Sequence, residues 1–158
     1  MAMHEGISHL AGVLGTWRGR GHGSYPTIRD FDYVDEMRFI DLGKPFLRFE
    51  QSTERPDGAR MHVEAGFLRV PQPETVELVV AIPTGQSEMG LGRVSVDGTT
   101  IVIETDATVH CTPTAKRVDR IVRRFTFDGD RLEYRMRMVA VGVGLTLHLA
   151  SELERVAD

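Results

Sequence analysis

The sequence predicts an all-β protein, a ten-stranded antiparallel up-and-down β-barrel with a short N-terminal helix. Apolar and polar residues alternate with a period of two along most of the 158-residue chain, as they do in strands with one buried face. Turn signals rich in glycine, proline and aspartate separate about ten such runs, and no helical pattern longer than the first one occurs. Consecutive hairpins favour closure into a barrel, because closure removes both sheet edges.

The N-terminal segment is the only predicted helix. Ile7, Leu10, Val13 and Leu14 recur at helical spacing, so they form one apolar face over one or two turns. We expect this segment to pack against the barrel.

The next segment, residues 15–25, is a strand with an unusual face. Every second residue belongs to a row of aromatic and glycine residues: Gly15, Trp17, Gly19, Gly21, Gly23 and Tyr25. Glycine weakens a strand and marks a bend, a bulge or the close approach of a bulky group. We therefore expect the row to leave room for a ligand inside a curved sheet.

The remaining strands are predicted by the same alternation, and short turn signals separate them. These signals lie at residues 43–45, 56–58, 71–73, 83–85, 97–98, 128–129 and 142–144. Asp-Gly at 97–98 and at 128–129 is typical of tight hairpins. The last strand is predicted over residues 145–155.

Length and composition indicate one domain over residues 1–158. The formal net charge is −4, and the arginines are scattered along the chain, so nothing favours nucleic-acid binding. Cys111 is the only cysteine, which excludes an internal disulfide and a cysteine-built metal site. No run of 18 apolar residues and no secretion signal occur, so we expect a cytoplasmic protein without a membrane segment.

Several polar and sulfur-containing side chains lie in these strands. Asp35 and Glu36 are interpreted as solvated charges. Met61, Met136 and Met138 are predicted to line the barrel, where their soft side chains suit an adaptable pocket. Two-histidine-one-carboxylate spacing, a nucleophile elbow and a phosphate loop are absent from the sequence.

Among the six histidines, His148 lies in the last predicted strand. Strict alternation groups it with the small residues Thr146 and Ala150 and leaves the leucines of this strand on the other face. If His148 faces inward, the small residues leave space beside it. Leu147 and Leu149 then face outward and need cover from a partner subunit or the first helix. A bulge near the preceding glycines is the other way to shift the phase. We expect His148 to face inward.

The glycine row belongs to a longer pattern that resembles the nitrobindin family of haem-binding β-barrels. The resemblance rests on motifs that follow one another along nearly the whole chain: Gly15-x-Trp17-x-Gly19-x-Gly21-x-Gly23-x-Tyr25-Pro26-Thr27-Ile28, Gly43 to Leu47, His62-x-Glu64-x-Gly66 to Arg69, Pro83 to Gly85, Ala115-Lys116 and His148-Leu149.

The resemblance implies one b-type haem per chain near the mouth of the barrel. It implies His148 as the single axial ligand of the iron, and Thr27 and Lys116 as residues in contact with the haem. A ferric haem of this kind converts peroxynitrite to nitrate and binds nitric oxide reversibly. A homodimer through the outer face of the last strand is compatible with this arrangement.

Two other functions stay open at this point. The same barrel without haem is a fatty-acid carrier if an interior arginine meets the lipid carboxylate. With haem it is a nitric oxide sensor or carrier if catalytic turnover is incidental.

Overall fold

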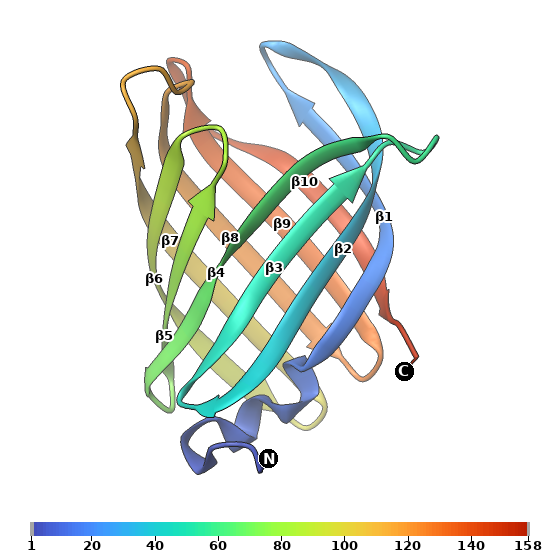
Figure 1. The fold of residues 1–158 in the computed structure, drawn as a ribbon, viewed down its shortest axis with the longest axis vertical. Coiled ribbons are helices and arrows are strands. Elements are labelled where there is room, and N and C mark those ends of the chain that lie inside the picture. The colour runs from blue at the N-terminus through green and yellow to red at the C-terminus, as the bar shows by residue number, and fades with distance from the viewer. Residues whose placement is uncertain (1, 158) are drawn as a thin grey trace.

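The computed structural model describes residues 2–157 and folds them into a closed barrel with a short helix at one end (Figure 1). All ten strands are antiparallel to their neighbours, and the first pairs with the last, so the predicted fold class is confirmed. The elements are η1 (Glu5–Val13), β1 (Gly15–Tyr25), β2 (Ile28–Lys44), β3 (Phe46–Glu54), β4 (Arg60–Gln72), β5 (Thr75–Ile82), β6 (Gln86–Asp97), β7 (Thr100–Cys111), β8 (Val118–Asp128), β9 (Arg131–Ala140) and β10 (Val143–Arg155).

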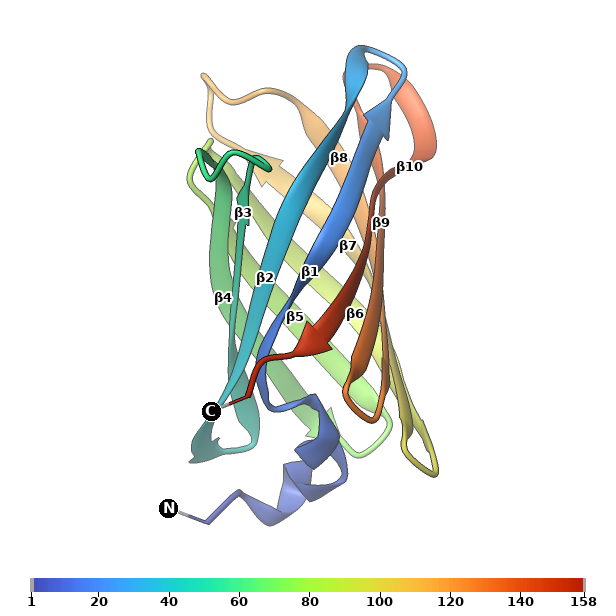
Figure 2. The ribbon, with the colours of Figure 1, turned by 90° about the vertical axis from the view of Figure 1, so that its right-hand side faces the viewer.

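The two ends of the barrel differ in how they are covered. The connections β2–β3, β4–β5, β6–β7 and β8–β9 lie at the end that carries η1, which we call the closed end (Figure 2). The other five connections lie at the opposite end, which we call the open end: β1–β2, β3–β4, β5–β6, β7–β8 and β9–β10. No helix within residues 2–157 has the length and apolar character needed to cross a membrane.

Helix η1 seals the closed end. It is a 3₁₀-helix whose Ile7, Leu10 and Val13 are fully buried, as the helical spacing predicted. Trp17 at the start of β1 donates its indole N–H to the Val13 carbonyl at 3.0 Å. The Arg155 guanidinium from the end of β10 lies over the Trp17 ring, 4.2 Å from its centroid. The Trp17 end of the glycine row is therefore part of this seal.

Aromatic rings fill the barrel above the helix. The Phe39 ring lies 5.3 Å from Phe49, 5.8 Å from Phe125 and 5.5 Å from Phe127, measured between ring centroids. All four side chains are buried, and each contributes roughly 2–3 kcal/mol of burial free energy. The closed half is thus a packed core that leaves the other half of the barrel for a ligand.

The glycine row of β1 faces the interior, but protein atoms occupy the space beside it. A β-carbon at Gly21 would overlap the Tyr33 ring, and one at Gly23 would overlap the Phe31 ring. At Gly19 the obstacle is the backbone of β10. The expectation that the row itself leaves room for a ligand was therefore wrong. The glycines let β10 approach closely and let two rings of β2 lie across β1, and those rings line the cavity described below.

Gly19→Ala is predicted to destabilise the barrel by roughly 3 kcal/mol, because the new methyl group collides with the β10 backbone, which cannot rotate away. Urea unfolding measures the change. Gly144→Ala is the matched control, since a β-carbon there meets no atom within 4 Å; it should be neutral or slightly stabilising. Equal stabilities of the two variants would contradict this account of the glycine row.

Candidate functional site

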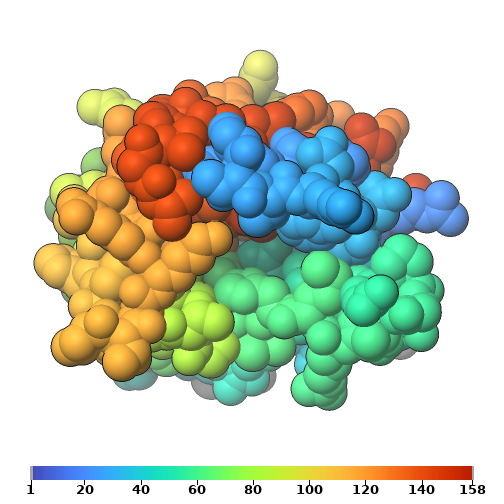
Figure 3. Space-filling view, turned by 90° about the horizontal axis from the view of Figure 1, so that it is seen from above, coloured from blue at the N-terminus to red at the C-terminus, as the bar shows by residue number. Residues whose placement is uncertain are grey.

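A cavity of about 370 Å³ opens at the end of the barrel away from η1. Figure 3 looks onto this end and shows a hollow between the β1–β2 and β9–β10 segments on one side and the β3–β4, β5–β6 and β7–β8 segments on the other. The volume lies within the range of small-molecule sites. The wall of the cavity is mainly apolar. Its apolar and aromatic residues are Phe31, Tyr33, Met61, Ile82, Val118, Ile121, Met136, Met138 and Leu149. Its polar residues are Gln51, Thr53, His62, Glu64, Thr84, Gln86, Lys116 and His148. The prediction that methionines line the barrel is confirmed for the buried Met136 and Met138, whereas Met61 borders the cavity but is 41% exposed.

His148 reaches this cavity because β10 is bulged at that residue. Leu147 pairs with Arg137 of β9 and Leu149 pairs with Met136, so two steps along β10 match one step along β9. A second register shift lies between Val143 and Thr146. It is close to Gly142 and Gly144, where the sequence suggested that a bulge could shift the phase of the strand. An extra residue shifts the strand phase by one.

Because of this phase shift, His148 and the leucines that follow it in β10 can all face the interior of the barrel. Leu147, before the bulge, is 39% exposed, as predicted for an inward His148. Leu149, after the bulge, lines the cavity, and Leu153 is buried in the core. The expectations that Leu149 faces outward and Ala150 inward were therefore wrong, because strict alternation does not hold across a bulge.

The ring of His148 is held by a backbone carbonyl and by aromatic neighbours. Its Nδ1–H donates to the Ser24 carbonyl of β1 at 3.0 Å. The rings of Tyr25 and Phe31 lie 5.5 and 6.3 Å from it in edge-to-face arrangements. A hydrogen bond at Nδ1 fixes the tautomer whose Nε2 lone pair is free to bind a metal.

The same surroundings keep the imidazole neutral. Burial lowers the pKa of His148 below its ordinary value, the hydrogen bond to Ser24 opposes this shift, and the positive charge of Lys116 adds to it. A neutral imidazole is the form that ligates iron. A histidine with a free Nε2 on a mainly apolar wall fits haem, because the porphyrin itself supplies the four equatorial ligands of the iron.

The other two predicted haem contacts lie differently. Lys116, in the β7–β8 connection, shares the cavity wall with His148. Thr27 lies in the exposed β1–β2 turn of the open end and is not part of the wall. Its contact with a haem therefore remains a prediction. Gly15 and Trp17 belong to the closed end, outside the cavity.

A second histidine faces the cavity from β4, across the barrel from β10. His62 donates its Nε2–H to Glu64 at 3.0 Å, and Glu64 is also bound by the Nη1 of Arg123. Burial alone would raise the pKa of Glu64, but the Arg123 charge and the His62 hydrogen bond outweigh it and lower the pKa to about 2. The Glu64 carboxylate is thus permanently charged and fixes the orientation of His62. The sequence signal for this pair was the i, i+2 spacing of His62 and Glu64, which places both on one face of a strand.

Arg123 is the centre of a buried polar layer between the cavity and the aromatic core. Its side chain is fully buried, its Nε donates to both carboxylate oxygens of Glu88 at 2.9 and 3.0 Å, and its Nη1 donates to the Tyr134 hydroxyl at 3.0 Å. Two carboxylates therefore already compensate this interior arginine. A fatty-acid carboxylate would meet their negative charge, which argues against the lipid-carrier alternative.

Asp35 belongs to the same layer, so its interpretation as a solvated charge was wrong. It is fully buried, accepts hydrogen bonds from Gln51 at 2.9 Å and from the Ser151 hydroxyl at 2.8 Å, and has no cationic partner of its own. Burial raises the pKa of Asp35 to about 6. Its position two residues from Tyr33 and from Met37 was the overlooked signal, because all three point to one face of β2.

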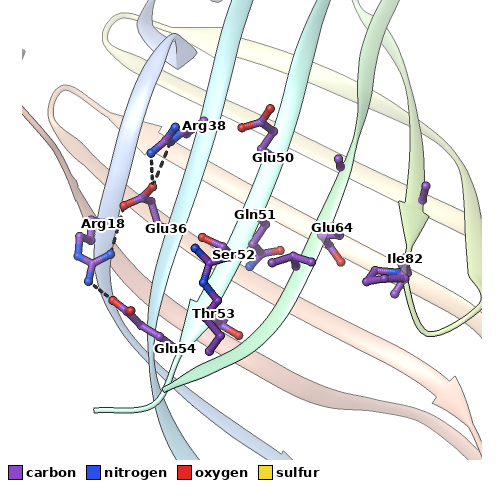
Figure 4. A pocket seen from close by; sticks show the side chains of 15 residues that line it. Arg18, Glu36, Arg38, Glu50, Gln51, Ser52, Thr53, Glu54, Glu64 and Ile82 are labelled. Carbon is purple, nitrogen blue, oxygen red and sulfur yellow. Dashed lines mark hydrogen bonds and ion pairs between the residues drawn. The ribbon is translucent and has the colours of Figure 1, made fainter. Parts of the chain in front are cut away.

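A separate groove lies on the outer side of the barrel, where β5 leaves β4 (Figure 4). The β4–β5 ladder ends at Ala65 and Ala81, so the first residues of β4 lack a partner on that side. Figure 4 shows Arg18 between Glu36 and Glu54, and Arg38 on Glu36. These exposed ion pairs are screened by solvent and pair the two arginines within the groove itself.

Comparison with known proteins relates the chain to one group. The family model described as a THAP4-like, heme-binding β-barrel domain matches residues 6–155. The peroxynitrite isomerase of Nocardia farcinica is 47% identical over 157 residues, which cover 98% of this chain and 94% of that protein. Peroxynitrite isomerase 2 of Mycobacterium avium is 47% identical over 155 residues, covering 97% and 96%.

The crystal structure of Rv2717c from M. tuberculosis has the same fold. It matches with a TM-score of 0.96 and 42% sequence identity, and the match covers 99% of this chain and 100% of that chain.

Asp35→Asn is predicted to stabilise the protein at neutral pH. Because the folded pKa is raised, the folded state binds the proton more tightly, and stability falls as pH rises from about 4 to about 6. Asparagine keeps the shape and removes this penalty, which is on the order of 2–3 kcal/mol above pH 6.5.

Urea unfolding of both proteins between pH 4.5 and 7.5 measures this effect. The advantage of Asp35→Asn should grow with pH, and the exposed change Asp97→Asn at the end of β6 should show no such trend. A constant difference between Asp35→Asn and the parent protein at all pH values would contradict the burial argument.

Proposed function

Because the chain belongs to the THAP4-like haem-binding β-barrel family, the nitrobindins, we propose that it is a peroxynitrite isomerase that works with a ferric haem in the open-end cavity. The observation that carries the proposal is the placement of His148, with its Nδ1 bonded to Ser24 and its Nε2 left free on an apolar wall. The proposal includes one b-type haem per chain and reversible binding of nitric oxide.

His148 is proposed as the axial ligand. The Ser24 carbonyl sets its tautomer, and burial keeps it neutral. Lys116, which lies in the cavity wall, is proposed to neutralise a haem propionate, because a cation beside a carboxylate is favourable at the mouth of the barrel. Thr27 is proposed as a further contact from the turn above the cavity.

The proposed reaction requires few functional groups from the protein. Peroxynitrite and nitrate contain the same atoms and carry the same charge, so conversion needs no net proton or electron. The haem, when bound, supplies an open iron coordination site at which the peroxide bond is weakened. The chain supplies the ligand, an apolar cage that holds the fragments together, and an entrance through the open end.

His62 is proposed to face the reacting anion from the opposite wall. Its Nε2–H is committed to Glu64, so its Nδ1 side is the one available to the cavity. Glu64 and Arg123 hold this orientation without adding a mobile charge. The histidine thereby gives the apolar cage one oriented polar group.

Location and assembly also remain proposals. We place the protein in the cytoplasm as a single domain. Leu145 and Leu147 are 37% and 39% exposed on the outer face of β10, and they support a homodimer through that face. Leu149 lies in the cavity wall, so it does not contribute to such an interface.

His148→Ala is predicted to abolish the Soret band that appears near 400 nm when haemin is added to the parent protein, because the iron loses its only protein ligand. The peroxynitrite decay rate should fall to that of free haem at the same concentration, measured by stopped-flow absorbance.

His22→Ala is the control for this experiment, since His22 lies on the outer face of β1 and pairs with the exposed Asp30 and Asp32. It should keep both the spectrum and the rate. A retained ferric spectrum in His148→Ala would overturn the axial assignment. A parent protein that binds haem but is no faster than free haem would favour a nitric oxide sensor.

A further inference from the structure

The β-ladder around His148 is interrupted on the side facing β1. The β1–β10 pairing ends at Gly23 and Leu149, one residue short of His148. The register between β1 and β2 also shifts between Gly23 and Tyr25. Regular backbone pairing with β1 therefore does not hold the part of β10 that precedes the bulge.

Tyr25 bridges this interruption with its side chain. Its hydroxyl accepts a hydrogen bond from the Ala140 N–H at 3.0 Å and donates to the Met138 carbonyl at 3.2 Å. Both partners lie at the end of β9, on the far side of β10 from β1. The buried Tyr25 ring also meets the His148 ring edge to face at 5.5 Å. One side chain thus contacts both the histidine and the hairpin that carries it.

The β9–β10 turn needs such an anchor. Val141 has a φ of +47°, in the left-handed region that β-branched residues avoid. A strained conformation persists only where its surroundings impose it. Two hydrogen bonds impose it here, from the Ala140 N–H to Tyr25 and from the Val141 N–H to the Arg117 carbonyl at 3.2 Å.

We propose that Tyr25 is a positioning residue, whose hydroxyl locks the β9–β10 hairpin and thereby holds His148 with Nδ1 on Ser24 and Nε2 toward the cavity. The haem-related part of this inference rests on the proposed axial role of His148. Ser24 and Tyr25 are adjacent, so the hydroxyl anchor and the carbonyl that orients the imidazole move together. Loss of the hydroxyl frees the hairpin, and the imidazole loses its fixed partner.

Tyr25→Phe tests the inference because it removes the hydroxyl and keeps the ring. Tyr134→Phe is the matched control, since its buried hydroxyl bonds to Arg123 and lies outside the cavity wall and the β9–β10 turn. Both variants lose a buried hydrogen bond, so a general loss of stability affects both. Circular dichroism and urea unfolding establish that each is folded.

Two measurements read the position of His148 directly. In the haem-free protein, ¹⁵N NMR of the His148 ring reports the share of each tautomer. In the haem-loaded protein, the iron–histidine band in resonance Raman spectra and the rate of haem transfer to apomyoglobin report the axial bond. We expect Tyr25→Phe to mix the tautomers, to shift or broaden the iron–histidine band, and to release haem about 10-fold faster. Tyr134→Phe should match the parent protein.

A folded Tyr25→Phe protein with parental tautomers, Raman band and haem-release rate would overturn the inference. Equal changes in Tyr134→Phe would overturn it as well, because they would show that the changes result from a general loss of stability and not from the loss of the Tyr25 hydroxyl. If His148→Ala keeps the Soret band, the axial assignment fails instead, and the NMR comparison still decides whether Tyr25 positions the imidazole.

Discussion

The extra residue that β10 inserts at His148 is the constraint on which the site depends. Without it, the leucines of β10 would point into the barrel along the whole strand, and the histidine would lie in solvent. With it, His148 and Leu149 both line the cavity, and Leu153 still packs in the core. In β10 the apolar and polar residues follow opposite phases on the two sides of His148, so the change of phase lets this one strand serve both the cavity and the core.

The polar layer around Arg123 separates these two halves. Above it lies the cavity with its histidines, and below it lie the phenylalanine core and η1. Its arginine and carboxylates are buried, and the hydrogen bonds of this layer join β2, β3, β4, β6, β8, β9 and β10 across the barrel. Such a network fixes the positions of strands that share no direct pairing. The cost of burying its charges is concentrated in Asp35, which has no cationic partner of its own.

Much of the fold follows from the sequence, because two-residue alternation and turn residues identify strands and hairpins directly. The site is only partly predictable, because its geometry arises where the alternation fails. The bulge at His148 has no signature in the pattern of Leu147 to Leu149. Asp35 could have been found, since it keeps the inward phase of Tyr33 and Met37. Gly21 and Gly23 were expected to leave room for a ligand, and only the structure shows that the aromatic rings of β2 occupy that space.

The irregularities that shape the site lie at the open end for a physical reason. The bulges of β10, the ladder end at Gly23 and the positive φ of Val141 all lie near the cavity. The closed end has register shifts of its own, between Asp41 and Lys44 and between Arg69 and Gln72, but there η1 covers the barrel and the core is packed. A complete ladder satisfies every backbone group and leaves none to orient a side chain. Where the ladder stops, the Ser24 carbonyl is free to orient His148 and the Ala140 N–H is free to bind Tyr25. The interruption of the sheet therefore provides the hydrogen bonds from which the site is built.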